Sequence, residues 1–119
     1  MSDLDRFESQ AEILKAMAHP VRLMILEELV KNPRCVSAIN EILEVRQSNI
    51  SQHLTILRNA GIVGSQKDGA HRCYFLIRPG LVEAAFNALN MNWPEADIND
   101  VRKKFKRALK NRLQQEQSS

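Results

Sequence analysis

The sequence predicts a mainly α-helical fold with a small β-hairpin (α+β), built as a single domain over residues 1–119. Apolar residues recur at spacings of three and four along most of the chain, as amphipathic helices require. Two short helical segments are joined by a link of three residues, and the periodicity becomes that of extended strands after Gly61. A chain of this length has the size of one domain and typically buries about two-thirds of its unfolded surface.

Four helices lie outside the two short segments. Residues 4–18 form an amphipathic pattern, and Pro20 suits the first turn of a second helix over about 20–31. The second helix is apolar nearly all round, which is typical of a helix at the centre of a bundle. A helix begins at Pro79, and the last one covers about 97–115 with an aspartate at its start.

The two short segments run over about 36–43 and 47–60. Their link, residues 44–46, is short enough to force a sharp crossing, and Gly61 stands where a helix commonly ends in the left-handed conformation. This spacing predicts a helix-turn-helix motif.

Two segments with the pattern of β-strands follow the second short helical segment. Residues 62–67 and 70–77 alternate as strands do, and Asp68-Gly69 between them is a strong hairpin signal. A hairpin after the second helix of such a motif is a wing. We therefore predict a winged helix-turn-helix core over residues 10–78.

The helix over 47–60 has the composition of a recognition helix. Ile50, Leu54 and Leu57 share its inward face, and small polar side chains occupy the opposite face. Gln and Asn can pair bidentately with adenine in the major groove, whereas a solvated polar face is the alternative reading. The residues predicted to contact bases are Gln47, Ser48, Asn49, Ser51, Gln52 and Thr55.

Positive charge is concentrated in two stretches. Residues 46–78 carry five basic side chains and one acidic one, and residues 97–119 carry seven basic and three acidic ones. A local basic field favours phosphate binding. Lys67, His71 and Arg72 lie on the wing, where contacts to the DNA backbone would set affinity and salt dependence. Solvated hairpin charges are the alternative.

Three ordered motifs resemble the ArsR/SmtB repressors. They are His19-Pro-Val-Arg-Leu-Met-Ile-Leu26, Gln47-Ser-Asn-Ile-Ser-Gln-His-Leu54 and Leu57-Arg-Asn-Ala-Gly-Ile-Val63, and the resemblance spans about residues 10–90. It implies a winged-helix homodimer that represses its operon until an inducer lowers its DNA affinity. The Ser common at the start of that family's recognition helix is Arg46 here, so Arg46 is predicted to contact phosphate instead.

The resemblance also implies where two copies meet. The flanking helices within residues 1–18 and 79–115 would form the dimer interface, through Leu4, Phe7, Leu14, Val82, Phe86 and Leu89. Two recognition helices would then read a near-palindromic operator in double-stranded DNA.

The inducer cannot be identified from the sequence. The family's arsenic and cadmium/lead sensors carry Cys-x-Cys, whereas this chain has Cys35-Val36-Ser37, and soft metals need at least two thiolates. Residues 79–92 hold no His or Asp for the family's zinc site, so we predict no metal and no cofactor. No pattern places Cys73, on the wing, near Cys35. Each cysteine could be a small buried hydrophobe, but Cys35, after a basic residue and near a helix start, is a possible thiol or metalloid sensor.

Three readings remain for the basic C-terminal helix. Its apolar stripe could pack against the domain or a second copy, its cations could contact phosphate, or the helix could bind a membrane surface. Removal of residues 97–119 distinguishes the first two.

Composition limits the class of protein. Two cysteines are too few for a disulfide framework and fit a reducing compartment, and the acidic N-terminus and short apolar runs fit neither a secretion signal nor a membrane span. We predict a cytoplasmic regulator that is not an enzyme, since the four scattered glycines form no nucleotide loop. A winged-helix protein-interaction module is the remaining alternative.

Overall fold

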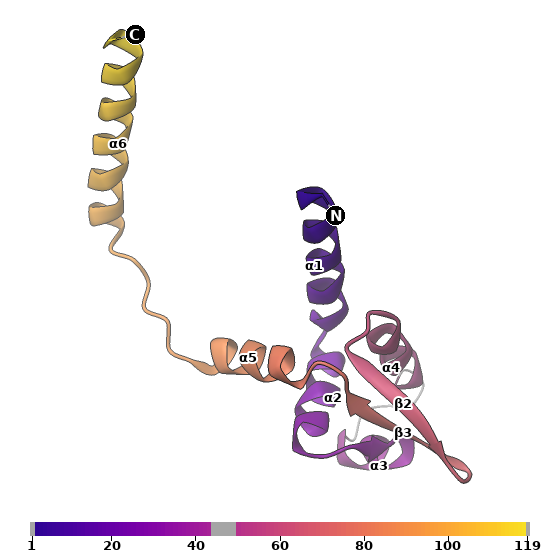
Figure 1. Ribbon diagram of the computed structural model, residues 1–119. Helices are drawn as coiled ribbons and strands as arrows, with labels where there is room; N and C mark the ends of the chain where they lie inside the picture. Colours follow the sequence, from indigo (N-terminus) through magenta and orange to yellow (C-terminus); the bar gives the residue numbers. More distant parts are fainter. Residues whose placement is uncertain (1, 44–49, 119) are drawn as a thin grey trace. The chain divides into compact units, whose positions relative to one another are not determined.

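The computed structural model describes residues 2–43 and 50–118 (Figure 1). Contacts divide the chain into two compact units, Met1–Leu89 and Asn90–Ser119, where the sequence predicted one domain over 1–119. The first unit contains the helices and strands of the predicted core, and the second contains the C-terminal helix.

Among the described residues of the first unit, five helices begin close to the positions predicted from sequence. Helix α1 starts with a capping box in which Ser2 Oγ accepts from the Asp5 amide (3.1 Å) and Asp5 Oδ2 accepts from the Ser2 amide (3.3 Å). His19 Nδ1 accepts from the Val21 amide (3.1 Å) and caps the next helix, whose first residue is Pro20. The helices are α1 Asp3–Met17, α2 Pro20–Lys31, α3 Val36–Leu43, α4 Ile50–Asn59 and α5 Pro79–Asn90.

Helix α4 is the predicted recognition helix. Its predicted start at residue 47 and the link 44–46 lie outside the described residues. At its end Gly61 adopts φ 74°, its amide donates to the Arg58 carbonyl (3.0 Å), and the Ile62 amide donates to the Leu57 carbonyl (3.1 Å). The expected glycine C-cap is therefore present, and it turns the chain into the hairpin.

Helix α2 is central to the first unit, as its all-round apolar pattern predicts. It contacts α1, α3, α4 and strand β3 of the hairpin. Ile25 and Leu26 of α2 are fully buried, together with Ile39 of α3. The same core includes Ile50, Leu54, Leu57, Ile62, Val63 and Val82, all fully buried.

The described residues form a three-stranded antiparallel sheet rather than a bare hairpin. Its strands are β1 Arg34–Cys35, β2 Val63–Asp68 and β3 His71–Leu76, in the order β1-β3-β2. The two-residue loop is Gly69-Ala70, one position later than the predicted Asp68-Gly69, because Asp68 pairs with His71. Gly69 supplies the positive φ (61°) that the tight turn needs.

Strand β1 is held against α2 by an ionic cluster. Glu28 of α2 is only 8% exposed, yet it accepts from Lys31 Nζ at 3.0 Å and lies 3.8 Å from Arg34 Nη2. A buried carboxylate requires such partners. The pairing therefore fixes the end of β1 beside the end of α2.

The second unit consists of a connecting segment and α6, Ile98–Ser118. Asp97 Oδ1 caps α6 by accepting from the amides of Asn99 (2.9 Å) and Asp100 (3.4 Å), as predicted. The helix carries seven basic and two acidic side chains. Its apolar stripe is exposed at Ile98, Val101, Phe105, Leu109 and Leu113. No described helix is both long enough and apolar enough to cross a bilayer.

Candidate nucleic-acid interface

Helix α4 presents one buried apolar face and one exposed polar face. Ile50, Leu54 and Leu57 are completely buried, whereas Gln52 and Thr55 are exposed. Ser51 is also exposed, and its carbonyl accepts from Thr55 Oγ1 at 2.8 Å. The apolar side chains thus fix the helix against α2 and α3, with its polar face outward. Four further predicted contacts, Arg46, Gln47, Ser48 and Asn49, lie outside the described residues.

A histidine pair forms part of the contact between α4 and α2. The rings of His53 on α4 and His19 at the start of α2 have centroids 4.4 Å apart. Burial, and then the nearby charges of His19 and Arg22, hold the pKa of His53 below its ordinary value of 6.5. A neutral His53 is therefore favoured in the folded protein.

The wing carries exposed basic side chains next to its tip. Lys67 and Arg72 are directly paired across β2 and β3, and His71 begins β3; all three side chains are exposed. Arg72 Nη1 donates to Ser65 Oγ at 3.1 Å, which orients the guanidinium along β2. The wing residues that are predicted to contact the DNA backbone are thus close together.

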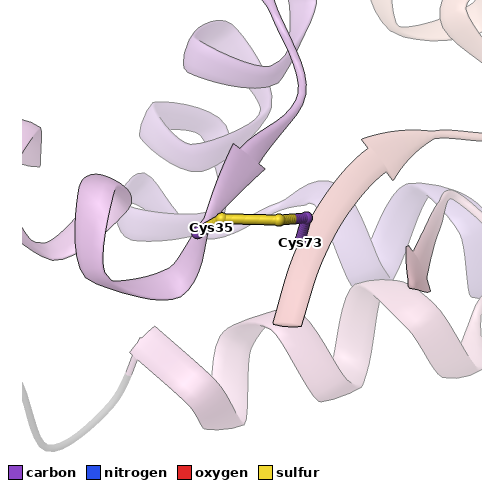
Figure 2. The surroundings of a disulfide bond; sticks show 2 residues. All are labelled: Cys35 and Cys73. Carbon is purple, nitrogen blue, oxygen red and sulfur yellow. A yellow bond between two sulfur atoms is a disulfide. The ribbon is translucent and has the colours of Figure 1, made fainter. Parts of the chain in front are cut away.

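The structure brings Cys35 and Cys73 together, which no sequence pattern indicated. Cys35 on β1 pairs directly with Cys73 on β3, their Cα atoms are 3.9 Å apart, and a disulfide joins them (Figure 2). Sequence reasoning missed this bond because strand β1 has only two residues and its partner lies 38 positions away. The two cysteines are the only ones in the chain.

The disulfide lies on the face of the sheet that points away from the core. Side chains of directly paired residues share a face, so Cys35, Cys73 and Gln66 form a row across β1, β3 and β2. Tyr74 and Val63, on the opposite face, are buried in the core, whereas both cysteines are only partly buried. Within the described ranges, no three His, Cys, Asp or Glu side chains gather as a metal site.

The predicted dimer residues differ in their exposure. Leu4, Phe7, Leu14 and Leu89 are more than half exposed, and Phe86 is partly buried against the core. Val82 is fully buried within its own chain, so it has no surface to offer a second copy, contrary to the prediction.

Buried helices around α2, an outward polar face on α4 and a basic hairpin after it define a winged helix-turn-helix protein. The family model described as "Bacterial regulatory protein, arsR family" matches residues 19–65. The chain is 43% identical over 75 residues to the uncharacterized HTH-type transcriptional regulator MJ1325 of Methanocaldococcus jannaschii, covering 62% of this chain and 84% of that protein. This chain therefore belongs to the arsR family.

Two solved structures are similar over most of their length. The transcriptional repressor PagR of Bacillus anthracis is 37% identical with a TM-score of 0.65, over 74% of this chain and 100% of that one. The homodimeric winged helix-turn-helix DNA-binding domain Mb0332 of Mycobacterium bovis is 25% identical with a TM-score of 0.64, over 81% and 97%. The resemblance drawn from the sequence motifs is confirmed.

Proposed function

We propose that this chain is a sequence-specific DNA-binding transcriptional repressor that acts as a homodimer. The observation that carries the proposal is the division of α4 between a completely buried face and an exposed face of Ser51, Gln52 and Thr55. A helix held in this way can enter a major groove and present its polar side chains to base edges. The family membership and the repressor PagR support the same function.

The wing supplies the sequence-independent part of this proposed binding. Lys67 and Arg72 contact sugar-phosphate beside the groove that α4 reads, and Arg46 and His71 are assigned the same role from the sequence. Gln47, Ser48 and Asn49, which precede α4 in the sequence, are assigned to the same base-reading set.

Dimerisation would place two α4 helices about one helical turn apart on a near-palindromic operator. The exposed residues Leu4, Phe7 and Leu14 share one face of α1, because they recur at spacings of three and seven. Together with Leu89 and the exposed part of Phe86, they form the proposed dimer interface. The homodimeric state of Mb0332 supports this arrangement. We further propose that the regulator acts in the cytoplasm and has no enzymatic activity.

The test is binding to the DNA upstream of the chain's own coding sequence, measured by fluorescence anisotropy and footprinting. Gln52→Ala is expected to weaken binding by about 1–3 kcal/mol, roughly fivefold to a hundredfold, because it removes one base-reading side chain. Asn59→Ala, at the opposite end of the same exposed face, is the matched control and should bind nearly as wild type. A protein-interaction module without DNA binding would give no footprint and no difference between the variants.

A second, regulatory function is favoured by the disulfide. We infer that the repressor responds to thiol chemistry, because the Cys35–Cys73 bond connects β1, at the start of the helix-turn-helix, to the wing strand β3. Disulfides in reducing compartments are mostly transient and redox-sensing. The measurement is the operator affinity of the oxidised and the reduced protein. Equal affinities, or an unchanged difference in Cys35→Ser, exclude this response.

A further inference from the structure

The two cysteines of the Cys35–Cys73 disulfide have different surroundings. A cleft of about 380 Å³ lies beside the wing, and Cys73, but not Cys35, forms part of its wall. The rest of the wall comes from Pro33, Gln66, Lys67, Asp68 and Phe75. A cleft of this volume is within the range that binds small molecules in proteins.

The direction of the disulfide across the sheet selects which sulfur is attacked. Thiol–disulfide exchange requires a thiolate to approach along the line of the S–S bond, from behind the sulfur that it attacks. Because Cys35, Cys73 and Gln66 lie in one row, the line extended beyond Cys73 runs over β2, on the side of Gln66 and the cleft. The approach to Cys35 would come instead from beyond the edge strand β1.

The position of Cys35 makes it the better leaving group. Cys35 is the residue immediately before α3, so it lies next to the N-terminal end of an eight-residue helix. The partial positive charge of a helix N-terminus stabilises a thiolate, and a stabilised thiolate leaves faster.

From these observations we infer that Cys73 is a thiol-exchange site, at which a low-molecular-weight thiol enters the wing cleft and forms a mixed disulfide. The inference rests on the thiol response proposed above and names the sulfur and the class of reactant. The thiolate RS⁻ bonds to Cys73 Sγ, and the Cys35–Cys73 bond breaks with its electron pair on Cys35 Sγ. A second RS⁻ then attacks the bound RS group and releases RSSR. Two thiols are oxidised, the protein disulfide is reduced, and the two thiol protons end on Cys35 and Cys73.

The mixed disulfide would change the proposed DNA-binding surface directly. Lys67 lines the same cleft and is one of the proposed phosphate contacts of the wing. A charged or bulky RS group on Cys73 would therefore occupy the cleft beside Lys67, although Lys67 and Arg72 project from the other face of the hairpin. Exchange also removes the covalent link between β1 and β3, next to α3 of the helix-turn-helix. Both effects lower the affinity for the operator.

The test uses the full-length oxidised protein and glutathione, quenched at short times with acid and N-ethylmaleimide. Trypsin cleaves after Arg34 and Arg72, so the two cysteines begin separate peptides, and mass spectrometry assigns the adduct. We expect glutathione on Cys73 and maleimide on Cys35. Glutathione on Cys35, an equal distribution, or reduction only after urea is added overturns the inference.

Charge variants test the route of entry independently of DNA binding. The Asp68 carboxylate lies on the same face as Cys73 and repels an incoming thiolate, so Asp68→Asn should accelerate the first exchange about threefold at low salt. Glu8→Gln on α1, a helix that contacts α2 and α4, is the matched control and should leave the rate unchanged. Equal rates in the wild type and both variants contradict entry through the wing cleft.

The operator affinity of the glutathione adduct is measured separately, on Cys35→Ser protein carrying glutathione on Cys73. Affinity at least fivefold below that of unmodified Cys35→Ser is expected. If exchange occurs at Cys73 but the operator affinity does not change, the proposed regulation of DNA binding by thiols is wrong. The inference that Cys73 is the exchange site would still be supported.

Discussion

The protonation state of His53, on the recognition helix α4, depends on the residues packed around its ring. Its Nδ1 is buried, and the described part of the chain offers this atom no hydrogen-bond partner. His19 faces it at a ring distance of 4.4 Å and is itself committed, through Nδ1, to the amide of Val21. Protonation of His53 would therefore add a charge beside His19 and Arg22, where burial already disfavours it.

The pH dependence of stability follows from the lowered pKa of His53. Below about pH 6.5 the unfolded chain binds a proton at this position more readily than the folded protein does, so stability falls as the pH is lowered. In His53→Gln this contribution is absent, and we expect a smaller drop in the urea midpoint between pH 7.5 and 5.5. The exposed His71→Gln is the control. A wild-type pH dependence in His53→Gln would contradict the assignment.

The Phe75 ring covers Gly64 so closely that a side chain at position 64 has no room. A Cβ at this position would lie 2.7 Å from Phe75 Cε2 and Cζ and 3.3 Å from Ile77 Cδ1. Phe75 is directly opposite Gly64 in the hairpin, so the ring would have to leave its place on β2. We expect Gly64→Ala to destabilise the protein by about 1–3 kcal/mol in urea unfolding. Gly80→Ala, where a Cβ meets nothing within 4 Å, should be neutral or slightly stabilising.

At the level of secondary structure, local patterns determined what the sequence could predict. The second and third helices match their predicted bounds, because apolar spacing, Pro20 and Asn32-Pro33 are all signals within a few residues. Strand β1 has no such signal: Arg34-Cys35 is too short for an alternating pattern. Its pairing with β3, like the ionic contact of Arg34 with Glu28, depends on the tertiary fold.

In the candidate site, too, the sequence predicted the features that depend on local patterns and missed the one that depends on the tertiary fold. The burial of Ile50, Leu54 and Leu57 followed from helical periodicity, and so did the exposure of Gln52. The Cys35–Cys73 bond did not follow, because no local pattern reports which strands are neighbours.

The disulfide closes a loop that contains α3, α4 and β2. With cysteines 38 positions apart, loop-closure entropy predicts that reduction lowers the free energy of unfolding by about 3–4 kcal/mol. Urea unfolding of the oxidised and reduced protein at one concentration measures this difference. Cys35→Ser should behave as the reduced wild type under both conditions. Identical midpoints for oxidised and reduced wild type would mean that the bond adds no stability to the helix-turn-helix.

Acidic and basic side chains are concentrated in different parts of the molecule. Residues 1–45 carry eight acidic and five basic side chains, whereas α6 carries seven basic and two acidic ones. The α6 cations Lys103, Arg107 and Lys110 lie on the side of the helix opposite the apolar stripe, as the 100° rotation per residue requires. The apolar stripe and these three cations are therefore on different sides of α6 and can be tested separately.

Removal of residues 97–119 tests the role of the stripe. A helix in water is marginally stable unless its apolar face packs against another surface, and five large apolar side chains of α6 are exposed in the single chain. We therefore expect the truncated protein to show a dimer dissociation constant at least tenfold higher in analytical ultracentrifugation. The triple variant Lys103→Gln/Arg107→Gln/Lys110→Gln keeps the stripe and should remain as dimeric as the wild type. An unchanged dimer after truncation, with a shallower dependence of operator binding on salt, would show instead that α6 contacts phosphate, since each lost phosphate contact reduces that slope by about one.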